Sequence, residues 1–117
     1  AYPFTIALRS TGEQIGNIGL RLTPPRADFG YILSERFWGN GYATEAATVI
    51  VNWALAQEEI FRIWATCHPN NYASARVLRK VGLELEARLD NWEAWPQLGE
   101  RAGPCLMFAK CRHTISV

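Results

Sequence analysis

Apolar and polar residues alternate through the first part of the chain, which is the pattern of half-buried β-strands. The alternation covers residues 4–8 and residues 14–22, and the turn-forming residues 10–13 lie between them. These two segments are predicted to pair as an antiparallel hairpin. A proline pair ends the second strand because proline cannot donate a hydrogen bond to a neighbouring strand. A third strand is predicted over residues 28–33.

From Tyr42 onward the apolar residues recur at intervals of three and four, which is the pattern of an amphipathic helix. This helix is predicted over residues 42–57, and an apolar strand follows it over residues 60–67. Because a helical crossover normally joins parallel strands, the strand at 60–67 is predicted to lie parallel to the strand at 28–33.

The last part of the chain predicts a second, shorter helix over residues 71–81. Asn71 is a favourable N-cap for it, and a glycine follows its last residue. Alternation then returns over residues 83–89. A long loop is predicted over residues 90–103, and residues 104–111 form a last strand.

The predicted order, β-β-β-α-β-α-β-β, describes a mixed α/β sheet in a single domain over residues 1–117. The net charge of +1 argues against a nucleic-acid partner. Three cysteines cannot all pair and lack metal-ligand spacing, so they are interpreted as reduced thiols and no metal is expected. The sequence has no membrane-length apolar run and no visible signal peptide, so a cytoplasmic protein without a membrane partner is expected.

Two glycines, Gly39 and Gly41, separate the strand at 28–33 from the first helix. A strand, a glycine turn and a helix start together favour an anion site, because glycine allows close approach and a helix N-terminus presents unpaired N–H groups. The P-loop would need a lysine where Tyr42 stands, and the dinucleotide fingerprint a third glycine where Thr44 stands. A plain connector between strand and helix is the alternative interpretation.

Two motifs carry a resemblance to a known family. The pattern R-x-x-G-x-G-x-A at residues 36–43 resembles the acyl-CoA pyrophosphate loop of the GNAT superfamily of N-acetyltransferases. The pattern N-x-x-S-x-x-V-x-x-K-x-G at residues 71–82 is similar to that superfamily's second signature, and W-G-N-G-Y-A-T-E-A at residues 38–46 looks like the ribosomal-protein N-terminal acetyltransferase branch. The resemblance covers residues 4–110. It implies a GNAT-like fold truncated at the N-terminus, since the family normally begins with a further strand and one or two helices, which usually wall the acceptor pocket.

The resemblance also implies a site for acetyl-CoA, the family's co-substrate. The pantetheine arm would lie where the third and fourth predicted strands splay apart, against the main chain of Tyr31, Ile32 and Leu33. The pyrophosphate would rest on the N–H groups of the loop formed by Arg36, Phe37, Trp38, Gly39, Asn40, Gly41, Tyr42 and Ala43.

Side chains of the second helix are implied in the same site. Asn71 would bond the pantetheine or the pyrophosphate, with plain N-capping as an equal alternative. Arg76 and Arg79 would face the 3′-phosphate of CoA, although arginines on a short amphipathic helix are more often only solvated.

Direct attack of an amine on the thioester requires a base, a donor for the oxyanion and an acid for the leaving thiolate. The resemblance implies Asp28 as the first candidate base and Glu86 as the second, and a solvated strand carboxylate is the alternative for each. A main-chain N–H near Ile32 or Leu33 would be the donor. Ser74 is implied near the sulfur, or else its hydroxyl satisfies the first turn of the helix.

Three further positions bear on the chemistry. Many relatives carry a tyrosine acid where this chain has Leu78, so that acid is missing. Glu45 is interpreted as support for the helix dipole. His68, which precedes a proline, is interpreted as a surface residue more often than a base.

The sequence therefore predicts an acetyl-CoA-dependent N-acetyltransferase that acts on a small amine or a protein N-terminus. A CoA-binding remnant without turnover is the first alternative, because of the missing front elements and Leu78. A nucleotide-binding domain of another fold is the second. Trp38, Trp92 and Trp95 predict either a lining for the acceptor pocket or a dimer interface, and a homodimer is expected.

Overall fold

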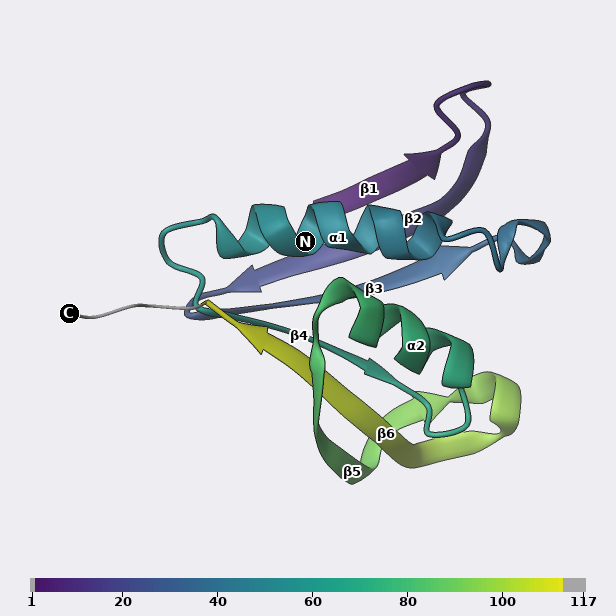
Figure 1. Ribbon diagram of the computed structural model, residues 1–117. Coiled ribbons are helices and arrows are strands. Elements are labelled where there is room, and N and C mark those ends of the chain that lie inside the picture. Colours follow the sequence, from purple (N-terminus) through teal and green to yellow (C-terminus); the bar gives the residue numbers. More distant parts are fainter. Residues whose placement is uncertain (1, 113–117) are drawn as a thin grey trace.

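The first two strands of the sheet form an antiparallel hairpin at the N-terminal end of the chain (Figure 1). The computed structural model describes residues 2–112. The elements in chain order are β1 (Tyr2–Ala7), β2 (Gln14–Thr23), β3 (Arg26–Leu33), the 3-10 turn η1 (Glu35–Phe37), α1 (Tyr42–Leu55), β4 (Arg62–Cys67), α2 (Tyr72–Val81), β5 (Glu84–Trp95), the 3-10 turn η2 (Pro96–Leu98) and β6 (Glu100–Cys111). The strands form one sheet in the order β1-β2-β3-β4-β6-β5, which confirms the predicted mixed α/β fold.

Both helices pack on the same face of the sheet (Figure 1). The core beneath them draws on both helices and on β2, β3, β4 and β6, and includes Ile18, Leu20, Ala27, Phe29, Ala47, Ile50, Val51, Ile63, Ala65, Leu78, Val81 and Phe108. The alternation in β2 and the helical period in α1 therefore follow the buried side of each element. Leu78 is 2% exposed, so the leucine where relatives carry a tyrosine belongs to the core.

The opposite face of the sheet is open to solvent along β2 and β3. Gly19 lies directly across from Gly30, and no atom lies within 4 Å of the position that a Cβ would take at either glycine. Ile32 on this face is 72% exposed. The apolar surface of the domain is thus unevenly covered, with the helices on one side of the sheet only.

The β3–β4 pair is short. Its registered pairs join residues 26–28 to residues 62–64 in parallel, while the other neighbouring strands run antiparallel. Beyond those pairs the two strands diverge (Figure 1). The predicted parallel pairing and the predicted splay are both confirmed. The divergence leaves main-chain groups of residues 29, 31 and 33 facing the gap, since those of residues 30 and 32 face β2.

The prediction of a long loop over residues 90–103 is wrong. β5 continues to Trp95, the η2 turn follows, and β6 begins at Glu100, so the two strands form one long hairpin. The register shifts between Leu89 and Glu93 and again between Glu93 and Trp95, and Asn91 has a φ of 51°. Such bulges break the regular alternation and bend a strand, which is why the segment resembles a loop in the sequence.

Within residues 2–112, neither helix has the length and apolarity that a membrane-spanning helix needs. 

Candidate functional site

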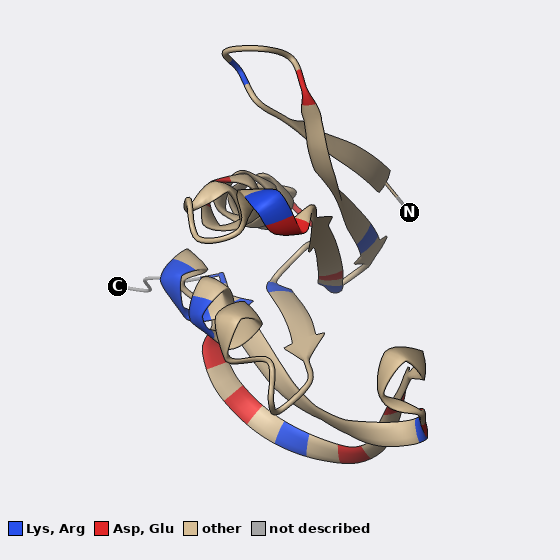
Figure 2. Cartoon of the chain, turned by 90° about the vertical axis from the view of Figure 1, so that its right-hand side faces the viewer, with Lys and Arg blue, Asp and Glu red and all other residues tan. Residues whose placement is uncertain are grey.

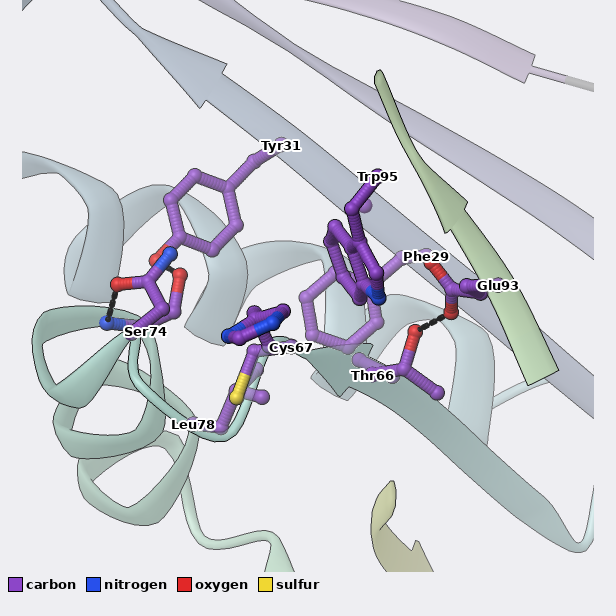
Figure 3. Close-up of a pocket in the computed structure, with 12 residues that line it drawn as sticks. Phe29, Tyr31, Thr66, Cys67, Ser74, Leu78, Glu93 and Trp95 are labelled. Carbon is purple, nitrogen blue, oxygen red and sulfur yellow. Dashed lines mark hydrogen bonds between the residues drawn. The ribbon is translucent and has the colours of Figure 1, made fainter. Parts of the chain in front are cut away.

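A cleft of about 270 Å³ opens where β3 and β4 diverge. It is lined by Phe29, Gly30, Tyr31, Ala65, Thr66, Cys67, His68, Asn71, Ser74, Leu78, Glu93 and Trp95. Figure 3 shows Tyr31 and Ser74 on one side of the cleft, and Thr66, Glu93 and Trp95 on the other. The cleft therefore has a hydroxyl side and an acidic, aromatic side.

The hydroxyl side joins β3 to the first turn of α2. The Tyr31 hydroxyl and Ser74 Oγ lie 3.1 Å apart and share a hydrogen bond. Asn71 Oδ1 accepts a hydrogen bond of 3.1 Å from the Ser74 N–H, so Asn71 is the N-cap of α2 and fixes Ser74 in place. Burial raises the pKa of Tyr31 above its ordinary value of 10.0. Both hydroxyls are therefore protonated at neutral pH.

The acidic side is built by the bulged part of β5. The Glu93 carboxylate accepts a hydrogen bond from Thr66 Oγ1 of β4. Among residues 2–112, no lysine or arginine forms an ion pair with Glu93. Its carboxylate thus faces the cleft without a cationic partner in the described chain. The sequence prediction missed Glu93 because it lies in the segment that was taken for a loop.

His68 joins this side from the end of β4. Its side chain is 13% exposed, so the interpretation of His68 as a surface residue is wrong. Nδ1 accepts a hydrogen bond of 3.1 Å from the Asn70 N–H, and Nε2 lies 2.9 Å from Glu100 Oε1. Since Nδ1 accepts, the ring proton is on Nε2 and is donated to Glu100.

The two residues predicted as bases lie elsewhere. Asp28 accepts hydrogen bonds of 3.0 and 3.1 Å from the guanidinium of Arg21 on the open face of the sheet. Glu86 pairs with Arg62, whose hydrogen bonds lower the pKa of Glu86. Neither carboxylate lines the cleft, so the structure does not bring Asp28 or Glu86 together with Ser74.

Cys67 forms part of the cleft floor and is 4% exposed. Burial raises the pKa of its thiol to about 11. The thiol is therefore neutral at physiological pH and behaves as an apolar lining group.

The glycine loop meets the N-terminus of α1 near the wide end of the gap. Gly39 and Gly41 have φ values of 80° and 78°, in the left-handed region that favours glycine. Gly41 is the N-cap residue and no side chain caps the helix, in contrast to α2. The first N–H groups of α1 can thus donate hydrogen bonds to an external acceptor, which suits an anion.

Side chains hold this loop in shape. Trp38 Nε1 donates a 2.8 Å hydrogen bond to the Leu33 carbonyl, and Asn40 Nδ2 donates to the carbonyls of Phe37 and Trp38 at 3.2 Å each. The Arg36 side chain is 74% exposed and lies 3.7 Å from a Glu13 oxygen. The loop is therefore preorganised around its two glycines.

Basic residues lie on α2. Figure 2 shows that lysine and arginine residues gather on this helix, and two of them, Arg79 and Lys80, lie in its last turn. Arg76 is exposed, and the Arg79 guanidinium lies over the Phe108 ring at 5.2 Å. Arg79 thus has a packing role whether or not it meets a phosphate.

Of the three tryptophans for which the sequence predicts a pocket lining or a dimer interface, one lies in the cleft and two are exposed on the surface. Trp95 lines the cleft, while Trp38 and Trp92 are 61% and 52% exposed. The homodimer stays a prediction.

The splayed strands, the glycine loop and the α2 cap place this chain in a family of proteins. The family model described as Acetyltransferase (GNAT) domain matches residues 1–84, and the chain belongs to this family. An uncharacterized N-acetyltransferase, p20 of Bacillus licheniformis, is 30% identical over 93 residues, which are 77% of this chain and 52% of p20. The chain spans about half the length of the curated relatives that it matches first.

Solved structures agree on the fold. A GNAT-family acetyltransferase from Bacillus anthracis superposes with a TM-score of 0.83 at 24% identity, covering 95% of this chain and 66% of that protein. Mycobacterium smegmatis RimJ in complex with CoA-disulfide superposes with a TM-score of 0.75 at 25% identity, covering 86% of this chain and 48% of RimJ. The predicted GNAT fold is confirmed.

Proposed function

We propose that this domain transfers an acetyl group from acetyl-CoA to a primary amine, on a small molecule or a protein N-terminus. The observation that carries the proposal is the cleft between the diverging strands, with two hydrogen-bonded hydroxyls on one side and, on the other, a carboxylate that forms no ion pair within residues 2–112. Family membership supports the reaction class.

The residues of the glycine loop fit the CoA pyrophosphate. The uncapped N–H groups at the start of α1 and the open space at Gly39 and Gly41 allow two phosphates to approach the main chain. The main-chain groups of Tyr31 and Leu33, which face the gap, would bond the pantetheine amides as an added strand does, whereas those of Ile32 face β2. RimJ supports this role as a relative of the same fold that is described in complex with CoA-disulfide.

The cleft residues can carry the two proton transfers. Glu93 takes the place proposed for Asp28 and Glu86, because it is the carboxylate that lines the cleft. Glu93 would accept a proton from the acceptor ammonium, and the free amine would attack the thioester carbonyl. As the carbon–sulfur bond breaks, the sulfur would take the Ser74 hydroxyl proton, which Tyr31 replaces through their shared hydrogen bond. The attacking nitrogen would lose its extra proton to solvent, and solvent would return a proton to Tyr31.

The first experiment is a calorimetric titration of the 117-residue chain with acetyl-CoA, with desulfo-CoA and ATP as controls. We expect acetyl-CoA to bind and ATP not to bind. CoA release is then followed with a thiol reagent over a panel of small amines and of peptides with free N-termini. Absence of acetyl-CoA binding would refute the proposal. Binding without thiol release from any acceptor would instead favour a CoA-binding module.

A further inference from the structure

Contacts on several sides fix the side chain of Trp95, which lies at the end of β5. Its Nε1 donates a 2.8 Å hydrogen bond to the Pro104 carbonyl across the hairpin. The His68 ring meets it edge to face, with ring centroids 5.2 Å apart and planes at 85°. Gly103 leaves room for it, since a Cβ there would lie 2.6 Å from Trp95 Cδ1. The indole is therefore a fixed wall of the cleft.

The His68 ring that presses on this wall is itself fixed at both nitrogens. The Asn70 N–H sets Nδ1, and Glu100 at the start of β6 accepts from Nε2. The His68–Glu100 hydrogen bond thus ties the end of β4 to the bent β5–β6 hairpin. In addition to the backbone pairing of β4 with β6, the hydrogen bond from Thr66 to Glu93 is a second side-chain link at this point, and it reaches the bulged part of β5.

The face of a rigid indole beside a carboxylate that has no cationic partner within residues 2–112 suits one chemical class of ligand. A primary alkylammonium ion places its charge at the carboxylate and its methylene groups against the ring, and the ring quadrupole adds attraction for the cation. Figure 3 shows Glu93 and Trp95 next to each other on the same side of the cleft. Ser74 and Tyr31 occupy the opposite side.

We propose that His68 and Glu100 are positioning residues, whose hydrogen bond holds Trp95 as the wall that receives an aliphatic primary ammonium ion at Glu93. The inference rests on the proposed function, because it specifies the acceptor of that reaction. His68 therefore affects the affinity of the cleft for the acceptor amine and does not affect the affinity for acetyl-CoA.

Binding is tested without turnover. The probe is n-butylammonium, with 1-butanol as the neutral ligand of similar shape, and the signal is the Trp95 indole N–H in a nitrogen–proton correlation spectrum. Trp95→Phe identifies that signal. We expect a saturable shift with n-butylammonium and a much smaller shift with 1-butanol. Glu93→Gln should abolish the preference, whereas Asp90→Asn, which removes an exposed carboxylate from the same strand, should keep it.

Two pairs of variants separate positioning from general damage. His68→Gln keeps an amide N–H near the Nε2 position, whereas His68→Asn keeps the Asn70 bond and loses the Glu100 bond. Glu100→Gln can still accept from His68, and Glu100→Ala cannot. Loss of one such bond should weaken n-butylammonium binding about tenfold in His68→Asn and Glu100→Ala. The two glutamine variants should stay within about threefold of the parent chain. The acetyl-CoA affinity should be unchanged in all four.

The outcomes are distinct. If His68→Asn binds n-butylammonium as well as the parent chain, or if acetyl-CoA affinity falls in parallel, the positioning role is refuted. If the parent chain binds acetyl-CoA but n-butylammonium does not move the Trp95 signal, the acceptor assignment fails while the proposed function stands. If n-butylammonium binds and acetyl-CoA does not, the transferase proposal fails instead.

Discussion

At the scale of single residues, the hydrogen bond between Tyr31 and Ser74 joins two elements that are far apart in the sequence. The predicted importance of Ser74 came from its motif, but the partnership with the Tyr31 hydroxyl depends on how β3 and α2 meet in space. Asn71 caps α2 by accepting a hydrogen bond from the Ser74 main-chain N–H, and the serine hydroxyl bonds Tyr31 instead. The two hydroxyls are therefore held as one hydrogen-bonded pair, which the proposed mechanism uses as its proton donor.

Removing either hydroxyl should reduce turnover. Ser74→Ala and Tyr31→Phe are each expected to lower kcat by about 100-fold, the scale of one general acid, with acetyl-CoA affinity nearly unchanged. Initial rates at saturating acetyl-CoA measure the effect. Tyr72→Phe is the control, because that tyrosine is 72% exposed and lies outside the cleft. Full activity in Ser74→Ala would remove the serine from the mechanism.

The buried thiol of Cys67 makes stability depend on alkaline pH. The folded state raises its pKa from 9.0 to about 11, so the folded state holds the proton more tightly than the unfolded chain. The contribution is complete below pH 9 and is lost as the pH rises through 11. Urea unfolding under reducing conditions should therefore show a free energy of unfolding that falls between pH 8.5 and 10.5. In Cys67→Ala this fall should be smaller, and an identical slope would contradict the assignment.

At the scale of elements, the α1 start and the β1–β2 turn offer a matched pair of glycines. Gly41 and Gly12 have φ values of 78° and 76°, and neither has an atom within 4 Å of a would-be Cβ. Alanine at either position should cost about 1–2 kcal/mol of stability, because the left-handed conformation is strained for other residues. Only Gly41→Ala should weaken acetyl-CoA binding, by about tenfold or more, since its loop presents the N–H groups. Calorimetry on both variants checks this, and an equal affinity loss in Gly12→Ala would contradict it.

The β5–β6 hairpin depends on the absence of a side chain at Gly103. A Cβ there would also lie 2.9 Å from Glu100 Oε2, so alanine must displace Trp95 or Glu100. Gly103→Ala should lower stability by about 1–3 kcal/mol through overpacking and should weaken amine binding at the cleft. Gly19→Ala is the control, because its Cβ would point into open space within a strand. Denaturant unfolding and the n-butylammonium titration measure the two effects.

Elements with a regular period were predictable, and the site was predictable only in part. The hairpin, both helices and the parallel β3–β4 pair follow from alternation, helical period and the crossover rule. The glycine loop followed from its motif. Glu93 and the contact of His68 with Trp95 did not, because bulges around Asn91 hide the strand and the contacts form between separate elements. Asp28 does not reach the cleft because the alternation of β3 places its side chain on the open face of the sheet, where it pairs with Arg21 of β2.

At the scale of the whole molecule, the strand pairing of the sheet is shortest in the middle, between β3 and β4. β1, β2 and β3 form one antiparallel block, and β4, β6 and β5 form another. Three registered residue pairs of β3 and β4 connect the blocks within the sheet, with both helices packed across the junction. The divergence of β3 and β4 is thus a seam between two half-sheets.

Because the two half-sheets share few strand pairs, the free energy of unfolding of the domain depends on whether a ligand occupies the gap between β3 and β4. A ligand that bonds both exposed strand edges would act as a missing strand and join the half-sheets, so occupancy and folding become linked quantities. Acetyl-CoA at about 100 times its Kd should then add about 2.7 kcal/mol to the free energy of unfolding. Thermal melting at rising acetyl-CoA concentrations measures this, and hydrogen exchange should slow most at residues 29–33. In a cell, the lifetime of the folded chain would then follow the supply of its own co-substrate.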